Sequence, residues 1–128
     1  MRTLLDTHAL FWWLTDDPQL STDARRAIET DAEGAHVSIA TAWEIAIKVG
    51  TGKWPEAAAL IDNFEVEVAA EGFKMLPIEV AHARAAGLSR STHRDPFDRM
   101  LVAQATIEEL TLITSDRKLA DLGAVCLW

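Results

Sequence analysis

Hydrophobic positions follow two patterns that alternate from one end of the chain to the other. Short apolar runs such as RTLL and TLIT are typical of buried strands, whereas apolar residues that recur every three to four positions predict amphipathic helices. The runs predict strands at residues 2–5, 36–38, 73–78, 111–114 and 125–128. The helical spacing predicts helices at residues 8–14, 22–33, 39–49, 56–70 (with a break near Asn63), 79–86, 96–110 and 116–122.

The best-defined helix start lies at Asp95 and Pro96. Aspartate is a favoured N-cap, and proline suits the first helical position because the N–H that it lacks would have no partner there. Ser21 is a second predicted N-cap, and Gly34 is expected to end the helix that Ser21 begins.

Strands that alternate with helices predict a parallel sheet covered by helices on both faces. The expected fold class is therefore α/β, a three-layer α/β/α sandwich with a central, mainly parallel sheet. At 128 residues the chain is expected to form one domain, residues 1–128. Ligands of such sheets bind outside the carboxyl ends of the strands, so the polar residues that follow each strand are the first candidates for a site.

Acidic residues occupy four such places. Asp6 and Asp116 follow the first and fourth predicted strands. Glu44 lies in the helix after the second strand, and Asp98 lies in the helix before the fourth. Mg²⁺ and Mn²⁺ prefer hard oxygen ligands, and Mg²⁺ takes few carboxylates while it keeps several waters. Two such ions can activate a water molecule and stabilise the leaving oxygen in phosphodiester cleavage. The pattern favours a catalytic metal site for Mg²⁺ or Mn²⁺.

Helix capping is the competing interpretation of these acids. Asp6, Asp95 and Asp116 each precede a predicted helix, where an N-cap is worth about 1 kcal/mol. Thr41 and Glu44 have the spacing of a capping box. For Asp95 the cap is the preferred interpretation, because proline follows it. The alternative function is therefore a non-catalytic α/β binding module whose acidic residues are helix caps.

Residues beside the acids are candidates for supporting roles. Thr7 and Ser115 adjoin Asp6 and Asp116 and are expected to hydrogen-bond a water or a phosphate at the site. Four residues around the start of the helix at 96–110 are expected to contact a phosphate or the metal ligands: His93, Arg94, Asp95 and Arg99. Tryptophans on helical stripes are predicted to belong to the core or a subunit interface: Trp12, Trp13 and Trp43.

The net charge of −8 counts against general electrostatic binding of nucleic acid, which relies on cationic patches. Divalent ions held by carboxylates would reverse that field locally. No apolar run reaches the roughly 18 residues that span a bilayer, so no membrane role is expected. Cys126, the single cysteine, is expected to be a core thiol of a reduced, cytoplasmic protein.

Four segments together resemble the PIN-domain family, and more narrowly the VapC-type toxins of bacterial type II toxin–antitoxin systems. They are LLDTHALFWWL, SIATAWEIAIKVGTGK, HRDPFDRMLVAQA and LITSD, and they occur in the family's order and spacing over essentially the whole chain. The resemblance implies a Mg²⁺- or Mn²⁺-dependent endoribonuclease whose four acids fall on Asp6, Glu44, Asp98 and Asp116. It also implies a homodimer, an RNA substrate and a cognate antitoxin protein that occupies the acidic groove.

Two other enzyme classes place a reactive aspartate after the first strand. An aspartyl phosphatase generally has a second acid two residues later, where this chain has His8. A response-regulator receiver needs an acidic pair beside its phosphorylated aspartate and a lysine after a late strand, and neither accompanies Asp6 or TLITSD. Both classes are disfavoured.

Overall fold

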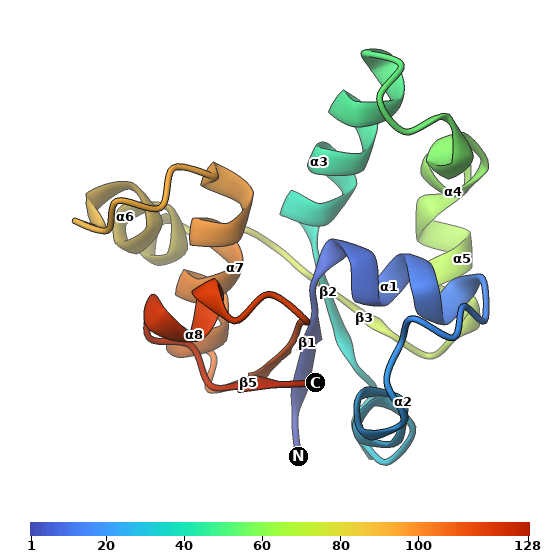
Figure 1. Cartoon of the computed structure of the whole chain (residues 1–128), viewed down its shortest axis with the longest axis horizontal. Helices are drawn as coiled ribbons and strands as arrows, with labels where there is room; N and C mark the ends of the chain where they lie inside the picture. The colour runs from blue at the N-terminus through green and yellow to red at the C-terminus, as the bar shows by residue number, and fades with distance from the viewer.

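Five strands form the central sheet of the structure, a computed structural model that describes residues 1–128 (Figure 1). All neighbouring strands are parallel, in the order β3-β2-β1-β4-β5. The strands are β1 (Thr3–Leu5), β2 (His36–Ser38), β3 (Lys74–Leu76), β4 (Thr111–Ile113) and β5 (Cys126–Leu127). The prediction of a mainly parallel α/β sheet is confirmed.

Eight α-helices and one short 3₁₀ helix connect the strands. They are α1 (Thr7–Leu14), α2 (Thr22–Glu29), α3 (Ile39–Gly50), η1 (Pro55–Ala57), α4 (Ala58–Asp62), α5 (Phe64–Ala70), α6 (Val80–Leu88), α7 (Pro96–Ile107) and α8 (Lys118–Asp121). None of them combines the length and the apolar character that a membrane span requires.

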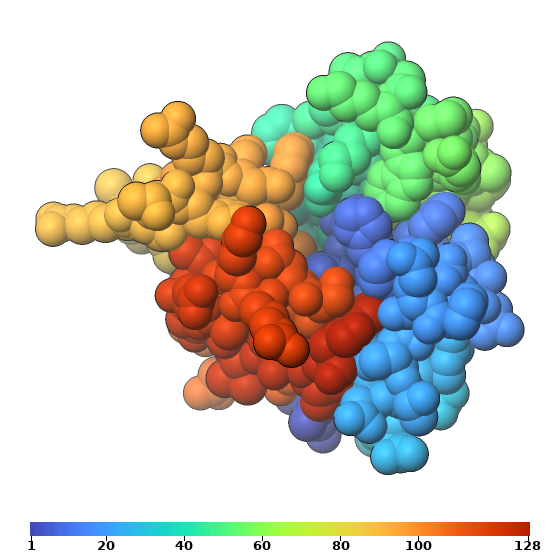
Figure 2. Space-filling model, in the orientation of Figure 1, coloured from blue at the N-terminus to red at the C-terminus, as the bar shows by residue number.

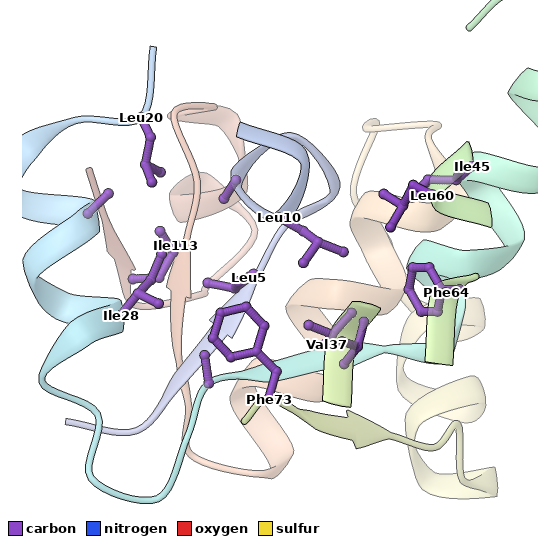
Figure 3. Packing of buried hydrophobic residues seen from close by; sticks show 14 of the residues in the cluster. Leu5, Leu10, Leu20, Ile28, Val37, Ile45, Leu60, Phe64, Phe73 and Ile113 are labelled. Atoms are coloured by element: carbon purple, nitrogen blue, oxygen red, sulfur yellow. The ribbon is translucent and has the colours of Figure 1, made fainter. Parts of the chain in front are cut away.

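Two hydrophobic cores lie on opposite faces of the sheet, because successive residues of a strand point to opposite faces. Leu5 of β1 belongs to the larger core with Leu10 of α1 and Ile28 of α2 (Figure 3). Leu4, its neighbour in the same strand, belongs to the second core with Leu101 of α7. Helices therefore cover both faces, which gives the three-layer arrangement that the sequence predicts.

Helix α2 ends at Glu29, earlier than the predicted end at residue 33. The reason is Asp31, whose carboxylate is buried and accepts hydrogen bonds from the backbone N–H and the hydroxyl of Thr3, both at 2.8 Å. A buried carboxylate requires such partners. The chain therefore leaves the helix to bring Asp31 to the start of β1.

Other helix boundaries also depend on packing. Helix α7 ends at Ile107, short of the predicted residue 110, because Glu109 adopts a positive φ of 56° and the turn carries Leu110 into the core. The predicted break at Asn63 is confirmed and separates α4 from α5. Helix α6 continues through Gly87, where the sequence predicts its end; one helical glycine costs only about 1 kcal/mol.

The strand order reverses next to β1. From β1 the chain proceeds to β2 and β3 at one edge of the sheet, and it then returns past β1 to β4 and β5 on the other side. Ligands of open parallel sheets bind at such a switch point, outside the carboxyl ends of the strands. In Figure 1 this place lies between α1 and α3 on one side and α7 on the other.

Candidate active site

A pocket of about 210 Å³ lies at the carboxyl ends of β1 and β4. In the space-filling view the blue, green and orange segments that surround it meet near the middle of the visible face (Figure 2). We call it the acidic pocket. It is lined by Asp6, Thr7, His8, Glu44, Lys48, Asp95, Asp98, Leu101, Ser115 and Asp116. The fold thus brings together all four predicted acids, together with Thr7, Asp95 and Ser115.

Asp6 is fixed between the two central strands and the start of α1. Its backbone N–H donates to the carbonyl of Ile113 in β4, at 3.1 Å. Its Oδ1 accepts a hydrogen bond from the backbone N–H of Ala9, at 2.8 Å, so Asp6 is the N-cap of α1 as predicted. The cap engages one carboxylate oxygen, which is compatible with a second role for the carboxylate in the acidic pocket.

Glu44 is buried, with 7% of its surface exposed. Its Oε1 accepts from the hydroxyl of Thr7 at 2.6 Å, and its Oε2 lies 2.8 Å from Nζ of Lys48. The predicted capping box from Thr41 to Glu44 is wrong, because Ser38 is the N-cap of α3 and its hydroxyl accepts from the N–H of Ala40. Capping therefore gives no reason for the placement of Glu44.

Asp95 and Asp98 divide two tasks at the start of α7. Asp95 caps the helix, since its Oδ1 accepts from the backbone N–H groups of Phe97 and Asp98, at 2.9 and 3.3 Å. Asp98 lies one turn inside the helix, and its Oδ2 is 2.8 Å from Nε2 of His93. His93 therefore orients an acid of the pocket, one of the two roles expected for it.

Asp116 enters the acidic pocket from the turn after β4. Its backbone N–H donates to the hydroxyl of Thr114, and its Oδ1 accepts from the backbone N–H of Lys118, both at 3.0 Å. These bonds hold the turn, and α8 begins only at Lys118, two positions after the predicted start at 116. Asp116 therefore supports the start of α8 without being its N-cap.

Burial and mutual repulsion act on the carboxyls of the acidic pocket. Burial raises the pKa of Asp6 above its ordinary value, and the negative charge of Asp98 adds to this increase. Burial likewise raises the pKa of Asp98, and the charges of Asp95 and Glu44 add to it, although the hydrogen bond from His93 opposes it. The pocket thus concentrates negative charge that a bound cation would stabilise.

The raised pKa of Asp98 makes a prediction about stability and pH. A carboxyl whose pKa is higher in the folded than in the unfolded protein contributes stability below its unfolded pKa, and this contribution is lost as pH rises through the folded pKa. In EDTA, we expect Asp98→Asn to unfold at higher urea concentration than wild type at pH 7, and at the same concentration at pH 4. An equal difference at both pH values would contradict this origin.

Arg94 and Arg99, near the start of α7, have different surroundings. The guanidinium of Arg99 donates to the carbonyls of Gly87 and Ser89, at 3.3 and 2.7 Å, so it joins α7 to the end of α6. Arg94 is exposed on the loop before α7. Of these two arginines, Arg94 is therefore the better placed for a phosphate contact, because the guanidinium of Arg99 is already engaged.

Two polar residues of the acidic pocket, Lys48 and His8, were not among the predicted site residues. Lys48 follows Glu44 by one helical turn, and this spacing predicts an ion pair on a helix. His8 follows Asp6 by two positions and lies in α1, with its ring 5.4 Å from those of Trp12 and Trp54. The helical spacing of Lys48 was a signal in the sequence, whereas the position of Trp54 beside His8 follows only from packing.

The predicted core residues differ in burial. Trp12 and Trp13 are half-buried against the larger core, as predicted. Trp43 is 62% exposed, lies edge-on to Phe97, and borders an apolar pocket of about 240 Å³ between α3, α6 and α7. Cys126 is half-buried against the second core. Trp43 is therefore not a core residue, and its role in an interface stays a prediction.

A second group of possible metal ligands comprises Glu79, His82 and Glu108, whose ligand atoms lie within 4.8 Å of one another. It shares no residue with the acidic pocket. His82 is buried, its Nδ1 accepts from the backbone N–H of Glu79 at 3.0 Å, and its Nε2 lies 3.1 Å from Oε1 of Glu108. Both ring nitrogens have protein partners: Glu79 and His82 form the capping box of α6, and Glu108, at the end of α7, lies against the buried ring.

A parallel sheet with carboxylates gathered at its switch point defines a class of α/β domain with an acidic functional site. The family model described as PIN domain matches residues 3–125. The chain therefore belongs to the PIN domain family.

Known proteins similar to the chain span nearly its full length. Ribonuclease VapC22 of Mycobacterium tuberculosis (strain ATCC 25618 / H37Rv) is 28% identical over 127 residues, with 91% of this chain and 88% of that protein covered. VapBC2 from Rickettsia felis, bound to a promoter DNA fragment, has a TM-score of 0.70 at 15% identity, with 99% and 98% covered. DNA-bound VapBC from Salmonella typhimurium has a TM-score of 0.69 at 17% identity, with 99% and 97% covered. The two structures show a shared fold.

Proposed function

We propose that this protein is a divalent-metal-dependent endoribonuclease that acts as the toxin of a toxin–antitoxin pair. The observation that carries the proposal is the convergence of Asp6, Glu44, Asp98 and Asp116, from four distant segments, on one pocket at the switch point of the sheet. The similarity to a protein named ribonuclease VapC22 supports RNA as the substrate. Membership of the PIN domain family agrees with the same site.

The donor atoms of the acidic pocket fit Mg²⁺ or Mn²⁺. Its ligands are carboxylate oxygens, which these hard cations prefer, and no cysteine lines the pocket. The negative charge of Asp98 raises the pKa of Asp6, and the charges of Asp95 and Glu44 raise that of Asp98, so negative charge is in excess in the pocket. When bound, such a cation lowers the pKa of water and neutralises charge on a leaving oxygen.

Each residue of the chain then has a task in the proposed reaction. Asp6, Glu44, Asp98 and Asp116 hold the cation. Thr7 orients Glu44 through the 2.6 Å hydrogen bond, and His93 orients Asp98 at 2.8 Å. Ser115 lies on the pocket wall, where its hydroxyl is available to a phosphate oxygen.

Partners are proposed on the same basis. The structural relatives from Rickettsia felis and Salmonella typhimurium are VapBC complexes, and one from Klebsiella pneumoniae is a toxin–antitoxin complex, with a TM-score of 0.66 at 18% identity. We therefore propose a cognate antitoxin that covers the acidic pocket. The exposed Trp43 beside an apolar pocket supports a homodimer. A reduced cytoplasmic location is compatible with the free thiol of Cys126.

Cleavage of total bacterial RNA by antitoxin-free protein tests the function. We expect cutting with Mg²⁺ or Mn²⁺ and none with EDTA, and attack by water predicts fragments with a 5′ phosphate and a 3′ hydroxyl. Asp6→Asn is the matched variant and should not cut. Asparagine caps a helix as well as aspartate does, but it lacks the negative charge that holds the cation. Cutting that survives EDTA, or fragments that end in a 2′,3′-cyclic phosphate, would contradict the mechanism.

The non-catalytic binding module makes a different prediction. Asp6 and Asp95 do cap helices, but a set of caps has no reason to bind divalent cations. We expect Mn²⁺ to raise the melting temperature of wild type and to leave that of Asp98→Asn unchanged. No cleavage together with no Mn²⁺ stabilisation would favour the binding module.

A further inference from the structure

Lys48 is the one lysine or arginine that lines the acidic pocket. Its Nζ lies 2.8 Å from Oε2 of Glu44, and the two residues are one turn apart on α3. The side chain of Glu44 is 9% exposed, whereas that of Lys48 is 37% exposed. The lysine therefore reaches from the solvent side of the pocket to its most buried proposed metal ligand.

This inference rests on the proposed function. We infer that Lys48 is a positioning residue that competes with the divalent cation for Glu44 and, once Glu44 turns to the cation, presents its ammonium group to an RNA phosphate at the pocket. Lys48 would thereby set the metal affinity of the pocket and supply one positive charge to a protein whose net charge is −8.

Charge balance is the first argument. Five carboxylates line the pocket, namely Asp6, Glu44, Asp95, Asp98 and Asp116. A buried carboxylate such as Glu44 needs a partner, and Lys48 provides it on Oε2 while Thr7 provides it on Oε1. A cation that binds Glu44 takes over the role of Lys48, because two positive charges on one oxygen repel each other.

The second argument is that Lys48 has a partner in addition to Glu44, namely the ring of Trp54. Its Nζ lies 5.8 Å from the centre of the Trp54 ring, within the range of a cation–π interaction. Phe11 contacts Trp54 edge-on at 4.9 Å, which holds that ring in place. The ammonium group of a flexible lysine can therefore leave Oε2 and stay over the Trp54 ring, which adjoins the pocket residue His8.

Mn²⁺ binding by RNA-free protein, measured by calorimetry, tests the competition. Lys48→Met keeps the length of the side chain and removes its charge, and we expect it to bind Mn²⁺ about tenfold more tightly than wild type. Lys53→Met is the control, because Lys53 is exposed and lies outside the pocket. The Mn²⁺ affinity of this variant should stay within about twofold of that of wild type. A purely structural role for Lys48 predicts the opposite sign, since a displaced Glu44 would weaken Mn²⁺ binding.

Steady-state cleavage at saturating Mn²⁺ tests the phosphate contact. The probe is an RNA oligonucleotide that spans a cut mapped in total bacterial RNA. We expect Lys48→Met to raise KM about tenfold while kcat changes less than about threefold, because a contact made equally in ground and transition states affects KM alone. Lys48→Arg keeps the charge and should restore KM to within about threefold of wild type.

The two measurements distinguish the inference from the function on which it rests. Equal or weaker Mn²⁺ binding by Lys48→Met would overturn the competition, and an unchanged KM would overturn the phosphate contact. Wild-type protein that binds Mn²⁺ but cuts no RNA would contradict the proposed function. In that case the Mn²⁺ affinities of Lys48→Met and Lys53→Met still decide whether Lys48 competes for Glu44.

Discussion

Replacement of Asp98 by asparagine is expected to reduce RNA cleavage about a hundredfold to a thousandfold, the scale on which removal of one essential electrostatic group acts. Asparagine has nearly the same shape, and its Oδ1 can still accept the hydrogen bond from His93. It lacks the negative charge that holds a cation. The initial rate of cleavage at saturating Mn²⁺ measures the effect.

Asp95→Asn is the matched control for Asp98→Asn. Both substitutions neutralise an aspartate of the acidic pocket in the first turn of α7 or at its N-cap. Asparagine is as good an N-cap as aspartate, so α7 should keep its start and cleavage should fall no more than about threefold. A loss at Asp95 as large as at Asp98 would mean that Asp95 belongs to the metal ligands. Full activity of Asp98→Asn would remove Asp98 from them.

Gly34→Ala is expected to destabilise the fold by about 2–4 kcal/mol, which for a domain of this size lowers the melting temperature by roughly 10 °C. Gly34 has a φ of +87°, and a Cβ built there would lie 2.3 Å from the carbonyl oxygen of Gly72. These glycines lie just before β2 and β3, whose backbones pair directly. A methyl group would have to push the two strand entries apart.

Gly52→Ala isolates the contribution of this contact. Gly52 has a φ of +73°, but no atom lies within 4 Å of the position of its Cβ. Alanine there should cost only the price of the left-handed conformation, about 1 kcal/mol. Urea unfolding of the two variants gives the difference. Equal losses of stability would show that the approach of Gly72 has no energetic consequence.

The order of strands and helices was predictable from the sequence because local signals specify it. Four apolar runs and the short segment HVS predicted all five strands, and the pairs Ser21–Thr22 and Asp95–Pro96 marked helix starts that the structure contains. The alternation of strands and helices along the chain then predicts parallel strands, and parallel strands place their carboxyl ends at the same edge of the sheet. The gathering of Asp6 and Asp116 at that edge follows from this geometry.

The sequence by itself therefore determined the parallel α/β fold and the place of Asp6 and Asp116 at its carboxyl edge, because both depend on short-range patterns and on which residue follows a strand. Glu44 and Asp98 reach the same pocket through the packing of α3 and α7. Only the tertiary structure decided which contacts complete these elements. Asp31 ends α2 because it reaches Thr3, and Gly34 needs its small size because Gly72 approaches it. Such contacts join residues far apart in the chain, and their distances depend on how the helices and strands pack.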